Sequence, residues 1–258
     1  MIDEELQAQL RAKYNPDGSL LRKGQLRMLE ILKIVDGICR KHKISYWLSS
    51  GTLLGAVRHG GFVPWDDDLD IEMLREDYLK LIPILKKELP NNLILQDGEV
   101  EEKYPYLFVK VRDKNSLIKE SNGYQLKNEG LFIDIFPLEK SFYPLFVIGH
   151  KMYMFLCFRF YSNDIVYKFN YSILQKIIYP FFRFLSSFKS DDVLRHTYGM
   201  GFRKSRNEND IFPLIELQFE GYSFYAPKNY DVYLNKMFGD YMNLPEIKSC
   251  HGNIKYVE

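Results

Sequence analysis

Residues that mark several special protein classes are scarce in this sequence. Glycine (16) and proline (11) are too few among 258 residues for a collagen-like or low-complexity chain. The three cysteines lie far apart and form no CxxC pair, which argues against a disulfide scaffold or a zinc finger and favours a reducing compartment. An excess of one charge is also missing: 35 basic and 34 acidic residues give a net charge of +1. With no basic stripe either, we expect no nucleic-acid partner.

Long hydrophobic runs are absent as well. Residues 1–14 lack the apolar core of a signal peptide. In the most hydrophobic segment, residues 142–188, no uncharged apolar run approaches the ~18 residues that a membrane span needs. The overall balance, 46% hydrophobic and 27% charged residues, is typical of a globular chain that buries its own core. These features predict a cytoplasmic protein of one domain.

The hydrophobic pattern predicts both helices and strands. Residues 25–43 repeat apolar side chains at helical spacing. Residues 131–136 are apolar on both faces apart from one carboxylate, which is typical of a buried strand, and Pro137 is expected to end it. Pro83 is expected to kink or divide a helix that ends near residue 89. The other predicted elements are strands over 44–48 and 107–112, a strand pair over 212–224 and a helix over 229–238.

Aromatic residues are concentrated in one segment. Sixteen of the 40 aromatic residues fall within residues 142–188, together with five basic residues and one acidic residue. The segment predicts two or three helices. Because aromatic stripes at helical spacing are usually core, we favour a helical subdomain packed on the sheet. The basic bias also permits a second interpretation, peripheral contact with an anionic membrane surface.

Four aspartates within Asp66 to Asp70 are the strongest chemical signal in the chain. In a strand, the carboxylates of Asp68 and Asp70 point to the same side, with Cα atoms ~6.6 Å apart. Hard oxygen ligands clustered in this way suit Mg²⁺ or Mn²⁺. A solvated acidic loop or a patch paired with Lys and Arg is the alternative. The apolar neighbours Leu69 and Ile71 argue against a simple loop.

Asp134 lies at the centre of an apolar strand, where an unpaired charge is costly. If that strand lies beside the one that carries Asp68 and Asp70, three carboxylates converge on one or two metal ions. The alternative is a structural ion pair between Asp134 and an arginine from elsewhere in the chain.

Five further residues are candidates for binding a phosphorylated substrate. Gly51 and Thr52 follow a predicted strand and open a predicted helix, and a helix N-terminus favours phosphate groups. Arg58 is placed to pair with a phosphate or to balance the aspartates. Lys110 and Arg112 share one face of a strand and are candidates for phosphate contact or for simple surface solvation.

The order of these motifs resembles the nucleotidyltransferase superfamily with a DNA-polymerase-β-like core. More narrowly, SSGTLLGAVRHGGFVPWDDDLDIEM with the later FIDIFPLE looks like the LicD family of phosphocholine transferases, which is related to fukutin and fukutin-related protein. The tail FEGYSFYAPKNYDVYLNKMFGDYM, followed by Pro245 and His251, is similar to the C-terminal part of that family. The resemblance implies an α+β fold, with a mixed sheet flanked by helices. It divides a single domain, 1–258, into a core (25–140), an aromatic helical insertion (141–205) and a C-terminal segment (206–258).

The resemblance also implies a reaction. A phospho-alcohol group, typically phosphocholine from CDP-choline, would be transferred to a sugar hydroxyl of a surface glycan such as lipopolysaccharide, capsule polysaccharide or teichoic acid, with release of CMP. Asp68 and Asp70 would bind Mg²⁺ or Mn²⁺, and Asp134 would complete the site as ligand and base. Gly51 and Thr52 would contact the phosphates of the donor.

Several features of the reaction stay open at this point. Ethanolamine, aminoethylphosphonate or a polyol phosphate could replace phosphocholine, and the acceptor could be a free glycan or a lipid-linked oligosaccharide. A nucleotidyltransferase that moves the NMP group is the alternative enzyme. The third hypothesis is a non-catalytic scaffold of glycan assembly. The presence of all three carboxylates, Asp68, Asp70 and Asp134, argues against it.

Overall fold

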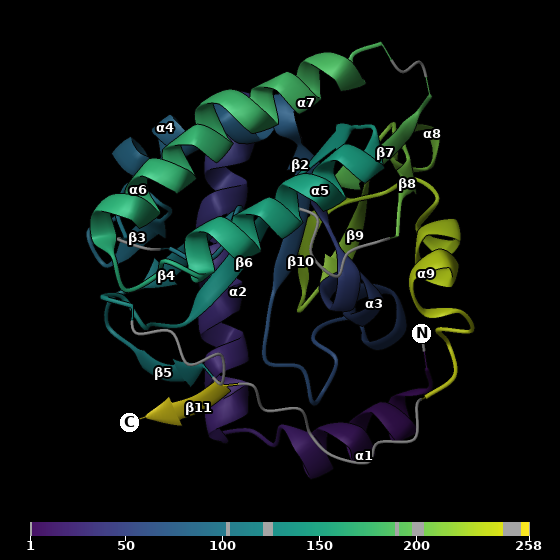
Figure 1. Cartoon of the computed structure of the whole chain (residues 1–258). Coiled ribbons are helices and arrows are strands. Elements are labelled where there is room, and N and C mark those ends of the chain that lie inside the picture. The colour runs from purple at the N-terminus through teal and green to yellow at the C-terminus, as the bar shows by residue number, and fades with distance from the viewer. Residues whose placement is uncertain are drawn as a thin grey trace.

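A mixed sheet of seven strands forms the centre of the protein (Figure 1). The computed structural model describes residues 2–101, 104–120, 126–188, 191–197, 204–244 and 254–257. Along the main path the strand order is β1-β2-β6-β4-β3, and β7 and β8 continue the sheet from the far end of β6. The strands are β1 (Trp47–Leu48), β2 (Asp70–Leu74), β3 (Leu93–Gln96), β4 (Val109–Asp113), β6 (Phe132–Lys140), β7 (Val193–His196) and β8 (Arg206–Asn207). Among the described strands of this sheet, β2 and β6 alone pair in parallel, and this confirms the predicted mixed α+β fold.

Strand β6 continues through Pro137, and so the prediction that this proline ends the strand is wrong. The pairing of β6 with β4 stops at Ile135, and its pairing with β7 begins at Leu138. Pro137 therefore lies at the junction between two partner strands. Proline has no backbone N–H, but no strand pairs with β6 at this position of that edge, so no hydrogen bond between strands is lost there.

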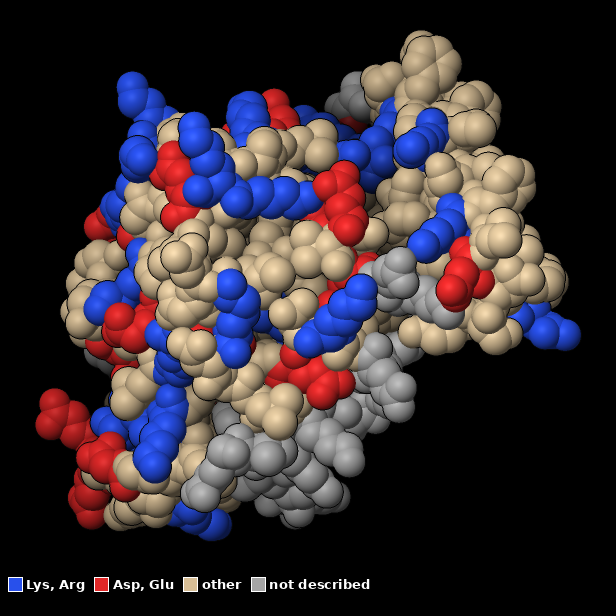
Figure 2. Space-filling view, turned by 90° about the vertical axis from the view of Figure 1, so that its left-hand side faces the viewer, with Lys and Arg blue, Asp and Glu red and all other residues tan. Residues whose placement is uncertain are grey.

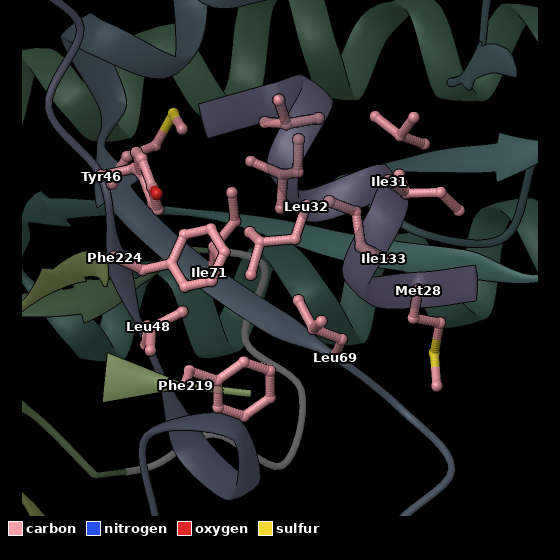
Figure 3. Packing of buried hydrophobic residues seen from close by; sticks show 14 of the residues in the cluster. Met28, Ile31, Leu32, Tyr46, Leu48, Leu69, Ile71, Ile133, Phe219 and Phe224 are labelled. Carbon is pink, nitrogen blue, oxygen red and sulfur yellow. The ribbon is translucent and has the colours of Figure 1, made fainter. Parts of the chain in front are cut away.

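Helix α2 (Leu20–His42) covers one face of the sheet (Figure 1). It begins five residues earlier than predicted because the Ser19 side chain accepts a hydrogen bond from the N–H of Arg22 and caps it. Figure 3 shows Met28, Ile31 and Leu32 of this helix packed among apolar side chains from the sheet. The hairpin of β9 (Ile215–Phe219) and β10 (Tyr222–Ala226) completes this core with two phenylalanines.

The other helices of the sheet region are α1 (Glu4–Tyr14), α3 (Ser50–His59), α4 (Arg75–Glu88), α8 (Glu208–Ile211) and α9 (Tyr230–Phe238). Helix α4 is one continuous helix that includes Pro83. Of the two outcomes predicted for that proline, division of the helix is therefore wrong, and a kink stays a prediction. The carbonyl that loses its helical partner belongs to Leu79, whose residue is 52% exposed, and water can replace the missing donor. Strand β5 (Leu117–Glu120) pairs with β11 (Ile254–Val257), while Pro245, Cys250 and His251 lie outside the described residues.

Residues 142–188 form two helical rods that lie side by side on the other side of the sheet, and we call this segment the aromatic lobe (Figure 1). The first rod is α5 (Tyr143–Tyr153) with the π-helical η1 (Met154–Phe158). The second is α6 (Asp164–Ile173), the π-helical η2 (Leu174–Ile178) and α7 (Tyr179–Ser186). The lobe has a small core of its own: Phe146, Tyr153, Cys157, Tyr167, Leu174 and Tyr179. The predicted helices are thus present, and the predicted domain division at residues 140 and 205 stays a prediction.

Candidate functional site

The alternation of side chains along β6 gives the central sheet one apolar and one polar face. Ile133 and Ile135 point into the core beneath α2, and Asp134 therefore points to the opposite side. In the pairing register, Asp134 lies beside Asp70 of β2 on one side and beside Lys110 of β4 on the other. Strands β2, β6 and β4 thus bring the carboxylates of Asp70 and Asp134 and the ammonium group of Lys110 together. They lie on the face of the sheet opposite α2, the side on which the aromatic lobe packs (Figure 1).

The segment before β2 adds further carboxylates to this group. Asp68 acts electrostatically on Asp66, Asp70 and Asp134. Burial raises the pKa of Asp66, Asp68 and Asp70, and for Asp66 and Asp70 the charge of Asp68 raises the pKa further. The acidic cluster, as we call Asp66, Asp68, Asp70 and Asp134, is therefore held together against strong mutual repulsion.

Lys110 supplies the positive charge next to Asp134. Its Nζ atom lies 2.6 Å from Asp134 Oδ1, and the residue is only 2% exposed. The same Nζ lies 3.4 Å from the ring centre of Phe132 and 4.9 Å from that of Tyr106. Burial nevertheless raises the pKa of Asp134 to about 6 although Lys110 acts to lower it. One ammonium group does not neutralise four neighbouring carboxyls.

The acidic cluster has the donor chemistry for a hard divalent cation. All of its donors are carboxylate oxygens, and the raised pKa values show that additional positive charge would stabilise the ionised forms. Within the described part of the chain, however, no three His, Cys, Asp or Glu side chains are grouped as they would be around a metal ion. The residues thus fit Mg²⁺ or Mn²⁺ by type and charge, and binding would require their side chains to draw together.

The N-terminal turn of helix α3 lies directly against this cluster. The N–H of Ser49 donates to the carbonyl of Asp70 (3.1 Å), and the N–H of Asp70 donates to Thr52 Oγ1 (2.8 Å). A Cβ atom on Gly51 would lie 2.5 Å from Asp66 Oδ2, so only glycine leaves room for that carboxylate. The buried hydroxyl of Ser49 has no hydrogen-bond partner among the described residues. A helix N-terminus with an unpartnered hydroxyl is a suitable place for a phosphate group.

Of the predicted binding residues, the structure brings Gly51, Thr52 and Lys110 to the acidic cluster. Arg112 lies two residues beyond Lys110 on the same strand face, but it is fully buried and donates to the side chain of Gln96 and, at 2.8 Å, to the carbonyl of Gly130. Arg58 donates to the carbonyl of Tyr241 (2.7 Å), although its charge still acts on Asp66. Both arginines therefore make structural contacts in the protein.

A buried polar network next to the site was not predicted from the sequence. Glu72 is fully buried, and its carboxylate accepts hydrogen bonds from Arg206 Nη2 (2.6 Å), Trp47 Nε1 (3.1 Å) and the Tyr233 hydroxyl (3.1 Å). His196 Nε2 lies 3.1 Å from the same carboxylate. The Tyr233 oxygen also accepts a hydrogen bond from the N–H of Ser50 at 3.3 Å. Ser50 has a left-handed backbone with φ of 46°. We call this group the Glu72 network, and it supports the strained turn that begins α3.

The sequence contains one signal for this network. Asp68, Asp70 and Glu72 alternate along the chain, so all three carboxylates are expected on one face of β2. The partners of Glu72 come from positions up to 161 residues away in the chain, and no local pattern indicates them.

Comparison with known proteins adds independent information. A family model described as "LicD/FKTN/FKRP, nucleotidyltransferase domain" matches residues 43–154. The lipopolysaccharide cholinephosphotransferase LicD of Haemophilus influenzae is 32% identical over 253 aligned residues, covering 87% of this chain and 92% of the relative. The ribitol 5-phosphate transferase FKRP of Mus musculus is 24% identical over 81% of this chain and 31% of its own length. The mannosyltransferase regulator 4 of Saccharomyces cerevisiae is 29% identical over 46% of this chain and 10% of the relative.

Proposed function

Because the chain belongs to the LicD/FKTN/FKRP nucleotidyltransferase-domain family and is a transferase of that family, we propose that it transfers a phospho-alcohol group to a glycan hydroxyl. The donor is a CDP- or CMP-activated small molecule, with phosphocholine or a similar head group such as aminoethylphosphonate. The observation that carries the proposal is the alignment of Asp70 with Asp134 beside the N-terminus of α3. This arrangement places acidic groups next to a turn that suits a diphosphate.

The acidic cluster is also the proposed metal site. Asp68, Asp70 and Asp134 would hold Mg²⁺ or Mn²⁺. When bound, such an ion neutralises the charge of the donor diphosphate and of the leaving CMP. The neighbouring positive end of α3, with the N–H groups of its first turn, would bind a phosphate oxygen and orient the diphosphate for in-line attack.

Asp134 has the properties of a general base for the acceptor hydroxyl. Its pKa of about 6 lies close to neutral pH, where a carboxylate is ionised and can still accept a proton effectively. Lys110 holds Asp134 by the 2.6 Å ion pair and thereby fixes the direction of its oxygens. We assign Lys110 to positioning Asp134 in place of the direct phosphate contact expected from the sequence.

We expect incubation with Mg²⁺, CDP-choline and a candidate glycan acceptor to yield free CMP and a glycan that gains the mass of phosphocholine. Mass spectrometry and nucleotide chromatography measure both products. A glycan that gains a nucleotide mass, with free phosphocholine, would show the alternative NMP transfer, because the acceptor would then have attacked the other phosphorus. CDP-ethanolamine, CMP-aminoethylphosphonate and a CDP-polyol complete the donor series. A panel with no transfer from any of these donors would contradict the proposal.

Replacement of Gly51 with alanine should reduce kcat/KM in this assay by roughly 10- to 100-fold. The new Cβ would lie 2.5 Å from Asp66 Oδ2 and displace a carboxyl of the acidic cluster. The matched control is Gly37→Ala within α2, where a Cβ would meet nothing within 4 Å. The control should keep full activity and gain about 0.5–1 kcal/mol in the free energy of unfolding. Equal activities of Gly51→Ala and Gly37→Ala would show that the position of the Asp66 carboxyl does not affect the reaction.

A further inference from the structure

The outer face of the aromatic lobe exposes an unusual number of large apolar side chains. Twelve of the twenty exposed large hydrophobic residues in the described chain belong to the lobe. Along the second rod and the turn that follows it they recur one or two helical turns apart, from Ile165 (81% exposed) and Phe169 (63%) to Phe188 (74%). The first rod contributes others, with Phe155 at 67% exposure. Seven of the exposed side chains are aromatic, so the aromatic residues of the segment are divided between this outer face and the core of the lobe.

Positive charge is dispersed over the same surface. Lys151, Arg159, Lys168 and Lys176 are exposed on the lobe, whereas Asp164 is its only acidic residue. In Figure 2 the lobe forms the right-hand side, where tan atoms predominate and blue atoms lie among them. An apolar face with interspersed basic residues complements an anionic bilayer surface, in which acyl chains lie beneath negative head groups. It complements a second copy of itself poorly, because like charges would meet.

The lobe does not need another protein surface to complete its fold. Its inner side chains form its own core, and they also attach the lobe to the sheet region. The Tyr153 hydroxyl donates to the carbonyl of Pro105 (3.0 Å), and the Tyr167 hydroxyl donates to that of Tyr104 (3.3 Å). Among the described helices none is long and apolar enough to cross a membrane. Lipid can therefore cover the outer face of the lobe only if the two rods lie parallel to the membrane, at the boundary between head groups and acyl chains.

The attachment of the lobe also relates it to the acidic cluster. The ring of Tyr104 lies 5.4 Å from that of Tyr106, and the Tyr106 ring lies 4.9 Å from Lys110 Nζ. Figure 1 shows the lobe on the side of the sheet opposite α2. Asp134 points to that side as well, because its neighbours Ile133 and Ile135 face the core beneath α2. A surface that binds the lobe would therefore lie on the same side of the sheet as the acidic cluster.

We propose that the outer face of the aromatic lobe is an interfacial membrane-binding surface for an anionic phospholipid bilayer. Apolar side chains of both rods insert among the acyl chains, and the basic residues contact the lipid phosphates. The contact is peripheral and reversible. It goes beyond the proposed transfer reaction and does not depend on the identity of donor or acceptor, because it follows from the exposed surface alone.

Sedimentation with liposomes tests the proposal. The full-length protein should bind vesicles of phosphatidylcholine with 30% phosphatidylglycerol at low salt. It should bind at least about tenfold more weakly to phosphatidylcholine alone or at 0.5 M NaCl. Ile165→Ser/Phe169→Ser should weaken binding by about tenfold or more, because two apolar anchors are lost. Lys151→Glu/Lys176→Glu should weaken it similarly and reduce its dependence on salt.

Matched variants outside the lobe act as controls. Leu79→Ser/Val232→Ser removes two exposed apolar side chains (52% and 49%), and Lys23→Glu/Lys87→Glu makes the same change in charge. Both should bind vesicles like the wild type, and circular dichroism should show the same helix content for all variants. Failure of the wild type to bind anionic vesicles at low salt would overturn the proposal. Equal binding of anionic vesicles by the lobe variants and the control variants would also overturn the proposal. Light scattering that shows a dimer dissociated only by the lobe variants, without vesicle binding, would assign the face to a second copy of the chain.

Discussion

Asp68→Asn and Asp70→Asn proteins are expected to lose transfer activity by at least about 1,000-fold while keeping their fold. Asparagine preserves the volume of each side chain and removes the charge that would hold a divalent cation at the donor diphosphate. The measurement is CMP release under saturating donor, with EDTA-treated wild-type protein as the parallel arm. Asp17→Asn is the matched control, since the Asp17 side chain is 90% exposed. Full turnover by Asp70→Asn or in EDTA would remove the metal from the proposed mechanism.

The substitutions Asp70→Asn and Asp134→Asn should change the stability of the metal-free protein in opposite directions. Burial and the charges of Asp68 and Asp134 raise the pKa of Asp70, so its ionised form destabilises the apo protein at pH 7, and Asp70→Asn should raise Tm. Asp134→Asn should lower Tm, because the ammonium group of Lys110 would lose its 2.6 Å partner while buried. Thermal melts without metal measure both effects. Added Mn²⁺ should raise the Tm of the wild type and have much less effect on that of Asp70→Asn. This measurement does not depend on transfer activity.

Glu72→Gln is expected to lower the free energy of unfolding by about 3 kcal/mol or more, the second large effect. The substitution leaves the buried guanidinium of Arg206 without the carboxylate that lies 2.6 Å away. It also weakens the hydrogen bonds from Trp47 and Tyr233, both of which donate to Glu72 Oε2. Urea unfolding followed by circular dichroism measures the loss. Glu30→Gln, which alters an exposed ion pair on α2, should cost less than about 1 kcal/mol.

The same network predicts a dependence of stability on pH. The charge of Arg206 is the main influence that opposes burial, and it contributes to lowering the pKa of Glu72 from 4.5 to about 2. A carboxyl whose pKa is lowered on folding adds stability that is fully present above pH 4.5 and is lost as the pH falls toward 2. The wild type should therefore lose more stability than Glu72→Gln between pH 4.5 and pH 2.5. Parallel curves for the two proteins over this interval would show that Glu72 is not the group responsible.

The sequence predicted those features that depend on local periodicity. The apolar run over residues 131–136, interrupted only by Asp134, indicated a buried strand, and the structure pairs Asp134 of this strand with Asp70 in register. Helical spacing located α2 and α9 to within a few residues. The family resemblance added the mixed sheet, whose parallel pair β2–β6 no local pattern specifies.

Other features depend on which distant residues meet. Lys110 and Arg112 alternate as surface residues would, yet both are buried, because β4 lies in the interior of the sheet between β3 and β6. The position of Arg58 depends on the carbonyl of Tyr241, which is 183 residues away in the chain. Exposure of the aromatic lobe depends on which faces of two rods meet, and hydrophobic spacing alone does not distinguish a face that contacts protein from one that does not.

The path of the chain around the aromatic lobe has a consequence for how such enzymes diversify. The chain leaves the sheet after Lys140 and returns as β7, where Leu194 pairs with that same Lys140. The two ends of the insertion therefore meet at adjoining positions of one ladder, and the length of what lies between them does not affect the strand register. Asp70 and Asp134 keep their alignment through other contacts, in β2 and the first half of β6. Exchange of this segment in evolution, or in a designed chimera, can thus change where the protein is recruited and leave its chemistry unchanged.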